Sequence, residues 1–301
     1  MTTDEELTRE IFREHFDRDL PPLSDLPEGL FAHEADYQAY LRKVLYFNKS
    51  VVEPLERAGM KKEDRIIDIA SGDGQMSVCL YLKGYREVVL FDLDENRLKR
   101  GRRVIRSLVG DDANPETIRD SATNLAGKYD VLISYQTIEH LSDTGNYSVA
   151  SRRCQKQFLA KVNGNVRRMC YFNAPNYRFP VDGHDTGIWF FHFLPISLRN
   201  WLISRKWVKC SWAGVAQPVS VGFLGRHLRK FRVASSYYAF GSMSEYLENY
   251  PPFNYMGKRM PNINPNSLSW KKRTVGYFAK AMGPRIQSFL PTVSVILKIK
   301  S

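Results

Sequence analysis

The hydrophobic residues of this chain form short runs that alternate with longer segments in which apolar residues recur every three or four positions. Short apolar runs bounded by turn residues are typical of buried strands, and the three-to-four spacing is typical of helices. Strands that alternate with helices indicate an α/β protein with a doubly wound, mostly parallel sheet. The pattern predicts strands at 65–70, 87–91, 129–134, 166–173 and 293–299, a weaker strand at 117–119, and helices at 4–19, 33–58, 75–83, 97–108 and 145–162.

After residue 173 the pattern changes. Aromatic residues, prolines and glycines crowd 174–215, which predicts a long insertion over the strand ends, where ligands bind in open α/β sheets. Residues 270–289 combine basic and aromatic positions and predict a basic interfacial helix. We therefore divide the chain into an N-terminal helical cap that covers the ligand cleft (1–64), an α/β core (65–173), and a substrate region with a basic tail and a final strand (174–301).

The charge is distributed unevenly along the 301 residues. The net charge is +12, but residues 151–301 contain 24 Lys and Arg against four Asp and Glu, a charge of +20. Such a segment predicts an anionic partner: a nucleic acid, an anionic membrane face, or an acidic or phosphorylated glycan. The alternative is a solvated basic surface. No apolar run reaches the length of a membrane span and no charged-then-apolar leader opens the chain, so we expect a cytoplasmic protein. The four cysteines are widely spaced and predict neither a zinc site nor a disulfide framework, and we expect no metal.

A glycine-bearing turn follows the first predicted strand, in the sequence RIIDIASGDGQ. Gly72 and Gly74 allow the backbone to approach a ligand closely, and Asp92, which ends the next strand, is placed to accept hydrogen bonds from ribose hydroxyls. Asp94 is a second candidate for that role. The acid Asp68 before the turn suits a cationic ligand and repels a diphosphate. The alternative is an ordinary strand-to-helix turn whose acids cap a helix.

The stretch resembles motif I of the class I S-adenosyl-L-methionine (SAM) methyltransferases, in which an acid is followed by three alternate glycines; Ala70 replaces the first of these. The resemblance implies a Rossmann-like fold that binds SAM as cofactor. It also implies that an acid and a small residue after the third strand bracket the adenine, which places Asp120 and Ser121 there. The alternative for this pair is a surface turn.

The run YDVLISYQTIEHL at 129–141 resembles the motif after strand four in many small-molecule and glycan methyltransferases. The resemblance implies that Ser134 and Gln136 lie near the methyl sulfonium. Glu139 and His140 are either catalytic or structural, as a helix-start acid and a hydrogen-bonded histidine.

A further element, Pro-Asn…Pro-Val-Asp-Gly-His…Leu-Pro within 174–195, is similar to one in SAM methyltransferases of bacterial polysaccharide and glycolipid biosynthesis. In chemical terms, Asp182 orients His184, which takes a proton from a substrate hydroxyl as that hydroxyl attacks the methyl group. The neighbouring aromatic residues offer flat faces to a sugar or lipid. The alternative is a packed aromatic loop in which His184 is only hydrogen-bonded.

Together these features predict a SAM-dependent methyltransferase that O-methylates an anionic or lipid-linked glycan or glycolipid acceptor. The basic charge also predicts an anionic membrane surface as a partner, with the protein bound peripherally at the inner membrane face. One alternative is methylation of a nucleic acid or of a small aromatic or lipid acceptor, and nucleic acid is less favoured because no RNA-binding signature is present. Another is a SAM-binding, membrane-associated scaffold without activity.

Overall fold

A computed structural model describes residues 3–142, 150–180, 186, 188–209, 216–236, 253, 257–258 and 292–300. The chain forms two compact units. Unit 1 comprises 1–119 with 240–277, and unit 2 comprises 120–239 with 278–301. The three-part division predicted from the sequence concerns roles along the chain and stays a prediction.

The strands form a seven-stranded sheet in the order β3-β2-β1-β4-β5-β7-β6. The pairs β1/β2, β2/β3 and β4/β5 are parallel, whereas β7 is antiparallel to both β5 and β6. This arrangement confirms the predicted α/β class with a mostly parallel, doubly wound sheet. The strands are β1 (Ile66–Ile69), β2 (Val88–Asp92), β3 (Glu116–Arg119), β4 (Tyr129–Tyr135), β5 (Val166–Pro175), β6 (Phe231–Ser236) and β7 (Thr292–Ile299).

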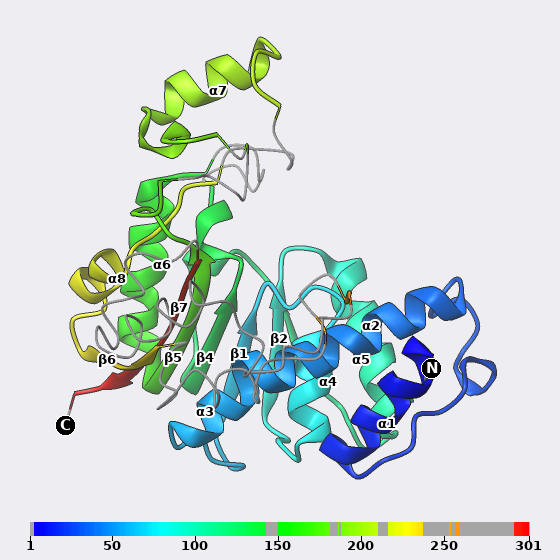
Figure 1. The fold of residues 1–301 in the computed structure, drawn as a ribbon. Helices are drawn as coiled ribbons and strands as arrows, with labels where there is room; N and C mark the ends of the chain where they lie inside the picture. The colour runs from blue at the N-terminus through cyan, green and yellow to red at the C-terminus, as the bar shows by residue number, and fades with distance from the viewer. Residues whose placement is uncertain are drawn as a thin grey trace, which may run out of the picture. The chain divides into compact units, whose positions relative to one another are not determined.

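In unit 1, helices surround strands β1 to β3 (Figure 1). Every residue of β1 and β2 is buried, while β3 is mostly exposed, which explains its weak sequence signal. The helix predicted at 33–58 contains a π-helical turn, η2, and its apolar stripe is fully buried. The helical elements are α1 (Asp4–Phe16), η1 (Leu23–Asp25), α2 (Glu34–Phe47), η2 (Asn48–Val52), α3 (Glu53–Arg57), α4 (Gln75–Leu82) and α5 (Glu95–Val109).

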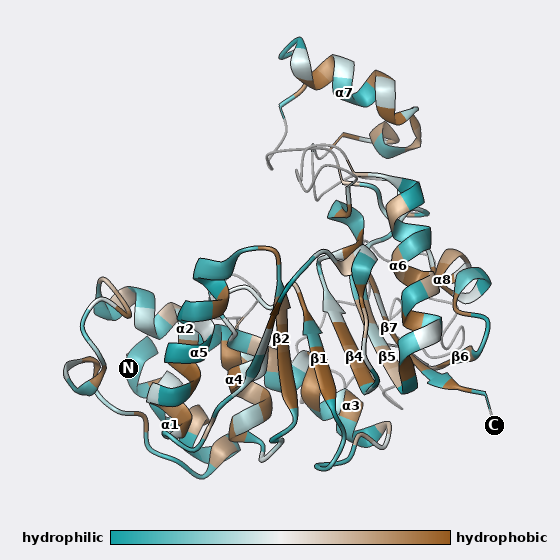
Figure 2. Cartoon of the chain, turned by 180° about the vertical axis from the view of Figure 1, so that it is seen from behind, coloured by the Kyte–Doolittle hydropathy of each residue, from teal (hydrophilic) through white to brown (hydrophobic). Residues whose placement is uncertain are grey.

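In unit 2, β7 lies between β5 and β6, with Phe172 opposite Val295 and Val233 opposite Leu297. The strands are largely hydrophobic along their length (Figure 2). The sequence pattern missed β6 and two helices, α7 and α8, and placed the start of α6 too early. The helical elements are η3 (Ala122–Asn124), η4 (Ile138–His140), α6 (Arg152–Asn165), η5 (Phe191–Phe193), α7 (Ile196–Ser204) and α8 (Val221–His227).

Candidate functional site

The turn between β1 and α4 has a left-handed backbone at three alternate positions. The φ angles are +57° at Ala70, +54° at Gly72 and +78° at Gly74. Glycine adopts this region without cost, whereas a side chain with a Cβ is strained there. The resemblance named Ala70 as the departure from the glycine pattern, and the structure shows that the backbone nevertheless keeps the conformation that glycine would favour.

The third of these positions also lies against helix α5. A Cβ on Gly74 would stand 3.2 Å from the Cα of Gly101, and a Cβ on Gly101 would stand 3.4 Å from the Gly74 nitrogen. Two glycines facing each other therefore allow the turn to rest directly on α5. This role of Gly101 is not visible in the sequence, because a glycine within a helix has no local signal beyond its cost to helix stability.

Asp92 is buried at the end of β2 and organises this turn. Its Oδ2 accepts a hydrogen bond from the Gly72 N–H at 2.9 Å, and its Oδ1 accepts one from the Asp94 N–H at 2.9 Å. Asp94 instead caps α5, since its Oδ1 accepts from the N–H groups of Asn96 and Arg97. Of the two carboxylates that the sequence offered, Asp92 is the one that contacts the turn.

Asp68 lies within β1 and is 3% exposed. Its Oδ2 accepts a hydrogen bond from the Ser77 hydroxyl at 2.9 Å. Burial raises the pKa of Asp68 to about 7; the hydrogen bond from Ser77 lowers it and the charge of Asp92 raises it further. Nearby, the hydroxyl of Ser71 is buried without a hydrogen-bond partner in the part of the chain that the structure describes.

Helix α2 contacts the same turn. The Tyr40 hydroxyl donates to the Asp73 carbonyl at 3.0 Å. The Asp73 carboxylate in turn pairs with Arg100 of α5 at 3.5 Å. The rings of Phe31 and Tyr40 meet edge-on, with centroids 5.3 Å apart. Burial raises the pKa of Tyr40, so this hydroxyl stays a donor at neutral pH.

In unit 2, the predicted adenine residues form a local turn. Oδ1 of Asp120 accepts from the Ser121 N–H at 2.6 Å and from the Asn124 side chain at 2.9 Å. The Ser121 hydroxyl caps η3 by accepting from the Thr123 N–H. These contacts match the surface-turn alternative, and a contact with adenine stays a prediction.

The end of β4 holds the residues predicted to face the methyl group. The Ser134 hydroxyl is buried and has no hydrogen-bond partner among the described residues. Gln136 has a left-handed φ of +50°. Its N–H donates to the Asn173 carbonyl at 2.8 Å, and its side chain donates to the Asn173 side chain at 2.5 Å. The backbone and the side chain of Asn173, in β5, therefore both bind Gln136, the residue directly after β4.

The Glu-His pair lies in η4. Glu139 is fully buried, and its carbonyl accepts from the Gln217 N–H at 2.8 Å. The Gln155 side chain donates to the carbonyls of Ile138 and Gln217, at 3.0 Å and 2.6 Å. These bonds fix η4 against the segment at 216–220. They involve no side-chain atom of Glu139 or His140, so both the structural and the catalytic role of the pair stay predictions.

The predicted catalytic pair, Asp182 and His184, lies outside the described residues. The flanking segment is ordered by Tyr177: its N–H donates to the Val219 carbonyl, and its own carbonyl lies 2.9 Å from Nε2 of His192. Within the described part of the chain, no group of three or more His, Cys, Asp or Glu side chains is placed to hold a metal.

Comparison with solved structures finds chains of related architecture. Magnesium protoporphyrin IX methyltransferase from Synechocystis PCC 6803, with bound SAH, is 12% identical; the match covers 99% of this chain and 100% of that chain, with a TM-score of 0.49. A SAM-dependent methyltransferase from Clostridium acetobutylicum ATCC 824 is 10% identical over 85% of this chain and 92% of that chain, with a TM-score of 0.49.

A third SAM-dependent methyltransferase, from Mesorhizobium loti, is 15% identical over 81% of this chain and 96% of that chain, with a TM-score of 0.44. A scan against protein-family models and a search of curated protein sequences give no match. At these identities and TM-scores the structural likenesses do not assign an activity to this chain, so an activity has to be argued from its own residues.

Proposed function

We propose that this protein is an enzyme that binds SAM and transfers its methyl group to an oxygen of a glycan or glycolipid. The observation that carries the proposal is the turn after β1. Three alternate left-handed residues follow a buried acid, and the carboxylate that ends β2 accepts a hydrogen bond from the middle glycine, Gly72. This combination leaves open backbone beside two carboxylates, which suits a ligand that carries both a ribose and a positive charge.

The residues present fit SAM in three respects. Each carboxylate oxygen of Asp92 accepts one backbone N–H and retains a lone pair, so Asp92 would accept from the ribose hydroxyls. The left-handed turn with Gly72 and Gly74 would hold the amino-acid part against bare backbone. The buried hydroxyl of Ser71, which lacks a partner among the described residues, would gain one from the ligand.

SAM, when bound, supplies an electrophilic methyl group on a positively charged sulfur. The chain's own contribution is to position the acceptor and to remove its proton. We assign the removal of this proton to His184, oriented by Asp182. A base is needed because a sugar hydroxyl is a weak nucleophile at neutral pH, and a histidine side chain ordinarily accepts a proton near that pH. Ser134 and Gln136 at the end of β4, and Asp120 and Ser121, complete the proposed cofactor set.

Binding of SAM and its demethylated product SAH, measured by calorimetry, tests the cofactor assignment. Asp92→Ala should weaken SAM binding by about 10- to 100-fold, because charged hydrogen bonds contribute roughly 1.5–3 kcal/mol. Asp92→Asn, which keeps an acceptor for Gly72, separates loss of charge from collapse of the turn. The control is Asp94→Asn, since Asn caps a helix as well as Asp does and SAM affinity should be unchanged. If the intact protein does not bind SAM, the assignment is wrong.

Turnover identifies the acceptor and separates an enzyme from an inactive scaffold. Labelled SAM is offered with glycan, lipid and RNA fractions, and the proposal expects label on a glycan or glycolipid. His184→Ala should lower turnover roughly 10²- to 10⁴-fold with SAM affinity unchanged. Label on RNA alone, with steeply salt-dependent binding, would favour the nucleic-acid alternative. SAM binding without turnover on any fraction would favour the scaffold.

We also propose that the protein docks on an anionic membrane surface. None of the described helices is long and apolar enough to span a bilayer. However, the segment around α7 exposes its apolar residues: Trp189 is 65% exposed and Trp207 is 70% exposed. Within helix α7 itself, Arg199 is only 1% exposed, and its guanidinium donates to the Ala216 carbonyl and the Gln217 side chain.

A helix that buries its arginine and exposes leucine and tryptophan is inverted relative to a water-facing helix, and tryptophan favours the membrane–water interface. Three basic residues follow α7: Arg205, Lys206 and Lys209. Each basic residue near anionic lipid contributes roughly 1 kcal/mol to binding. The predicted basic tail, 270–289, lies outside the described residues and would add to this attraction.

Co-sedimentation with vesicles tests the membrane proposal. Vesicles containing phosphatidylglycerol should retain the protein and those of phosphatidylcholine alone should not, with the difference shrinking as salt rises. Replacing Trp189 and Trp207 by Ala should reduce retention, and Lys271, Lys272 and Arg273 changed to Glu should release the protein. Leu93→Ala, at an exposed apolar residue of unit 1, is the control. Equal, negligible binding to both vesicles would reject the proposal.

A further inference from the structure

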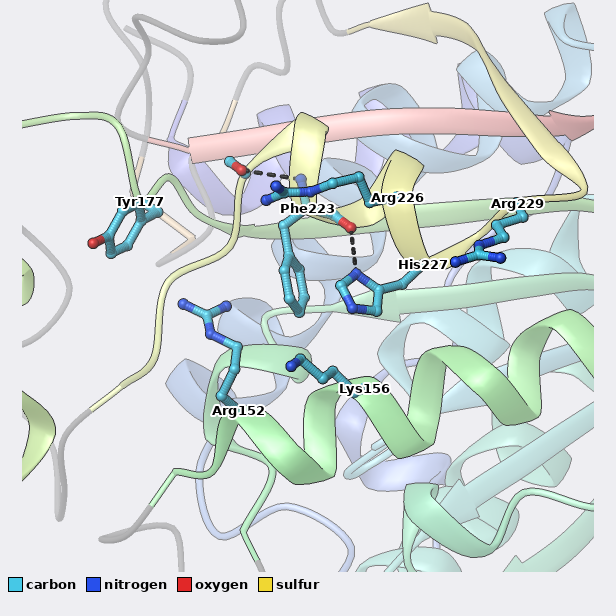
Figure 3. A pocket seen from close by; sticks show the side chains of 8 residues that line it. Arg152, Lys156, Tyr177, Phe223, Arg226, His227 and Arg229 are labelled. Atoms are coloured by element: carbon cyan, nitrogen blue, oxygen red, sulfur yellow. Dashed lines mark hydrogen bonds between the residues drawn. The ribbon is translucent and has the colours of Figure 1, made fainter.

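A cavity in unit 2 lies between helices α6 and α8, beside the segment that follows β5 (Figure 3). Its volume is about 790 Å³, within the usual range for sites that take small organic molecules. A bare inorganic ion would fill only a small part of it. The lining side chains belong to Arg152, Lys156, Tyr177, Ser220, Phe223, Arg226, His227 and Arg229.

The described residues of the lining are strongly basic and include no acid. Arg152 and Lys156 extend from α6 toward α8, and Arg226 and Arg229 approach from the other side (Figure 3). None of these four cations forms an ion pair with a described residue, whereas many charged residues of 4–119 do. Four unpaired cations around one hollow repel each other, and an anion placed among them relieves that repulsion.

Arg152 is held in place before any ligand arrives. Its guanidinium donates to Oε1 of Gln155 at 2.8 Å and to the Pro218 carbonyl at 3.1 Å. The same group lies 4.6 Å from the ring centroid of Phe223 and 5.9 Å from that of Tyr177. Burial lowers the pKa of Arg152 to about 10, which still leaves it charged at neutral pH. A fixed, planar cation of this kind loses little freedom when it binds an oxyanion.

His227 adds a group that is directed by the backbone. Its Nδ1 lies 2.9 Å from the Phe223 carbonyl, which acts as the acceptor and therefore leaves Nε2 as the free ring nitrogen (Figure 3). The His227 and Phe223 rings lie 4.5 Å apart. Phe223 thus positions both the imidazole and the Arg152 guanidinium. The cations of the lining favour an anion over a cation in this place.

We propose that this cavity binds the phosphate or diphosphate group of a small organic molecule. Oxyanions with several acceptor oxygens match the arginine and lysine donors of the lining, and the volume leaves room for the organic part. The further assignment of this molecule as the methyl acceptor rests on the proposed function. Phosphate binding by the cavity does not depend on that function, and it is measured without SAM.

The test is calorimetric titration of the full chain, without SAM, with inorganic pyrophosphate and with glucose 1-phosphate. Both should bind, and Lys156→Gln or Arg226→Gln should each weaken binding by about tenfold, as expected for a charged hydrogen bond. Lys161→Gln is the matched control, because it removes the same charge from an exposed position of the same helix, α6, outside the cavity. Circular dichroism establishes that the variants are folded.

Arg152→Lys keeps the charge but removes the planar fork, so it should also weaken binding, and by more for pyrophosphate than for glucose 1-phosphate. Vesicles containing phosphatidylglycerol provide the second source of phosphate: retention that depends on Lys156 supports a lipid headgroup as the occupant, and titration by glucose 1-phosphate supports a soluble one. The proposal is overturned if neither probe binds the intact protein, or if Lys161→Gln weakens binding as much as Lys156→Gln. Binding of an RNA oligonucleotide that is far tighter than either probe and insensitive to Lys156→Gln also overturns it.

Discussion

Asp68→Asn is expected to make the protein more stable at alkaline pH. Asp68 is 3% exposed, and its side chain accepts a hydrogen bond from the Ser77 hydroxyl, which the side-chain oxygen of asparagine would also accept. The pKa of Asp68 is about 7 in the folded chain and about 3.9 when unfolded. The folded state therefore binds the extra proton between these values, and stability falls as pH rises from about 4 to about 7 and stays low above that.

The size of the effect follows from the two pKa values. Each unit of pKa difference corresponds to 1.36 kcal/mol, so the raised pKa of Asp68 costs about 4 kcal/mol of stability at pH 8 and about 1–2 kcal/mol at pH 5. The neutral asparagine avoids this cost. Asp68→Asn should therefore gain about 2–3 kcal/mol more over the natural chain at pH 8 than at pH 5.

Urea unfolding at pH 5 and pH 8, followed by far-ultraviolet circular dichroism, measures this difference. Circular dichroism is preferred because the described tryptophans all lie in unit 2, whereas Asp68 lies in unit 1. Asp94→Asn is the control: its side chain is 49% exposed and still caps α5, so no gain at pH 8 is expected. An equal change at both pH values, or a loss at pH 8, would refute the reasoning that ionised Asp68 destabilises the fold.

Three further substitutions test the turn and its supports. Ala70→Gly should raise the free energy of unfolding by about 1 kcal/mol in thermal or urea melts, because it removes left-handed strain. Ala160→Gly, at an exposed position of helix α6, should lower it by about as much, and a loss of stability at both sites would contradict the strain at Ala70. Gly101→Ala should lower the free energy of unfolding by about 1–3 kcal/mol and weaken SAM binding, because the new Cβ meets backbone atoms of the turn. Gly164→Ala, which has open space around it, should leave stability unchanged or raise it. Equal effects of the two substitutions in melts and calorimetry would contradict the close contact at Gly101. Tyr40→Phe should cost about 0.5–1.5 kcal/mol in urea melts with the fold intact, and an unchanged stability would show that its hydroxyl bond contributes nothing.

The sequence was sufficient to predict the helices and strands whose hydrophobic pattern is set by burial on one or both faces. β1 and β2 are buried throughout and were predicted within two residues. The weak signal at 117–119 corresponds to β3, whose residues are mostly exposed and so carry little hydrophobic pattern. In contrast, α7 exposes apolar residues and buries Arg199, so a rule that places apolar residues inside could not find it.

The candidate site was predictable only where its chemistry follows the order of the chain. Asp92 and the glycines of the turn stand at strand ends, and a strand end is visible in sequence. The support from Tyr40 and the contact with Gly101 come from helices packed against the turn, and the cavity joins α6, α8 and the end of β5. Contacts between distant segments leave no local spacing, so a single sequence does not reveal them.

The position of β7 has a consequence for synthesis of the chain. β5 and β6 both pair with β7 in unit 2, yet they leave the ribosome first. At 5–20 residues per second, roughly 3–10 seconds separate the emergence of Ser236 from that of Thr292. During that interval two strands have open edges and no partner between them, which is the condition in which nascent chains aggregate or bind chaperones. Slowing translation between these two residues should therefore lower the yield of folded protein.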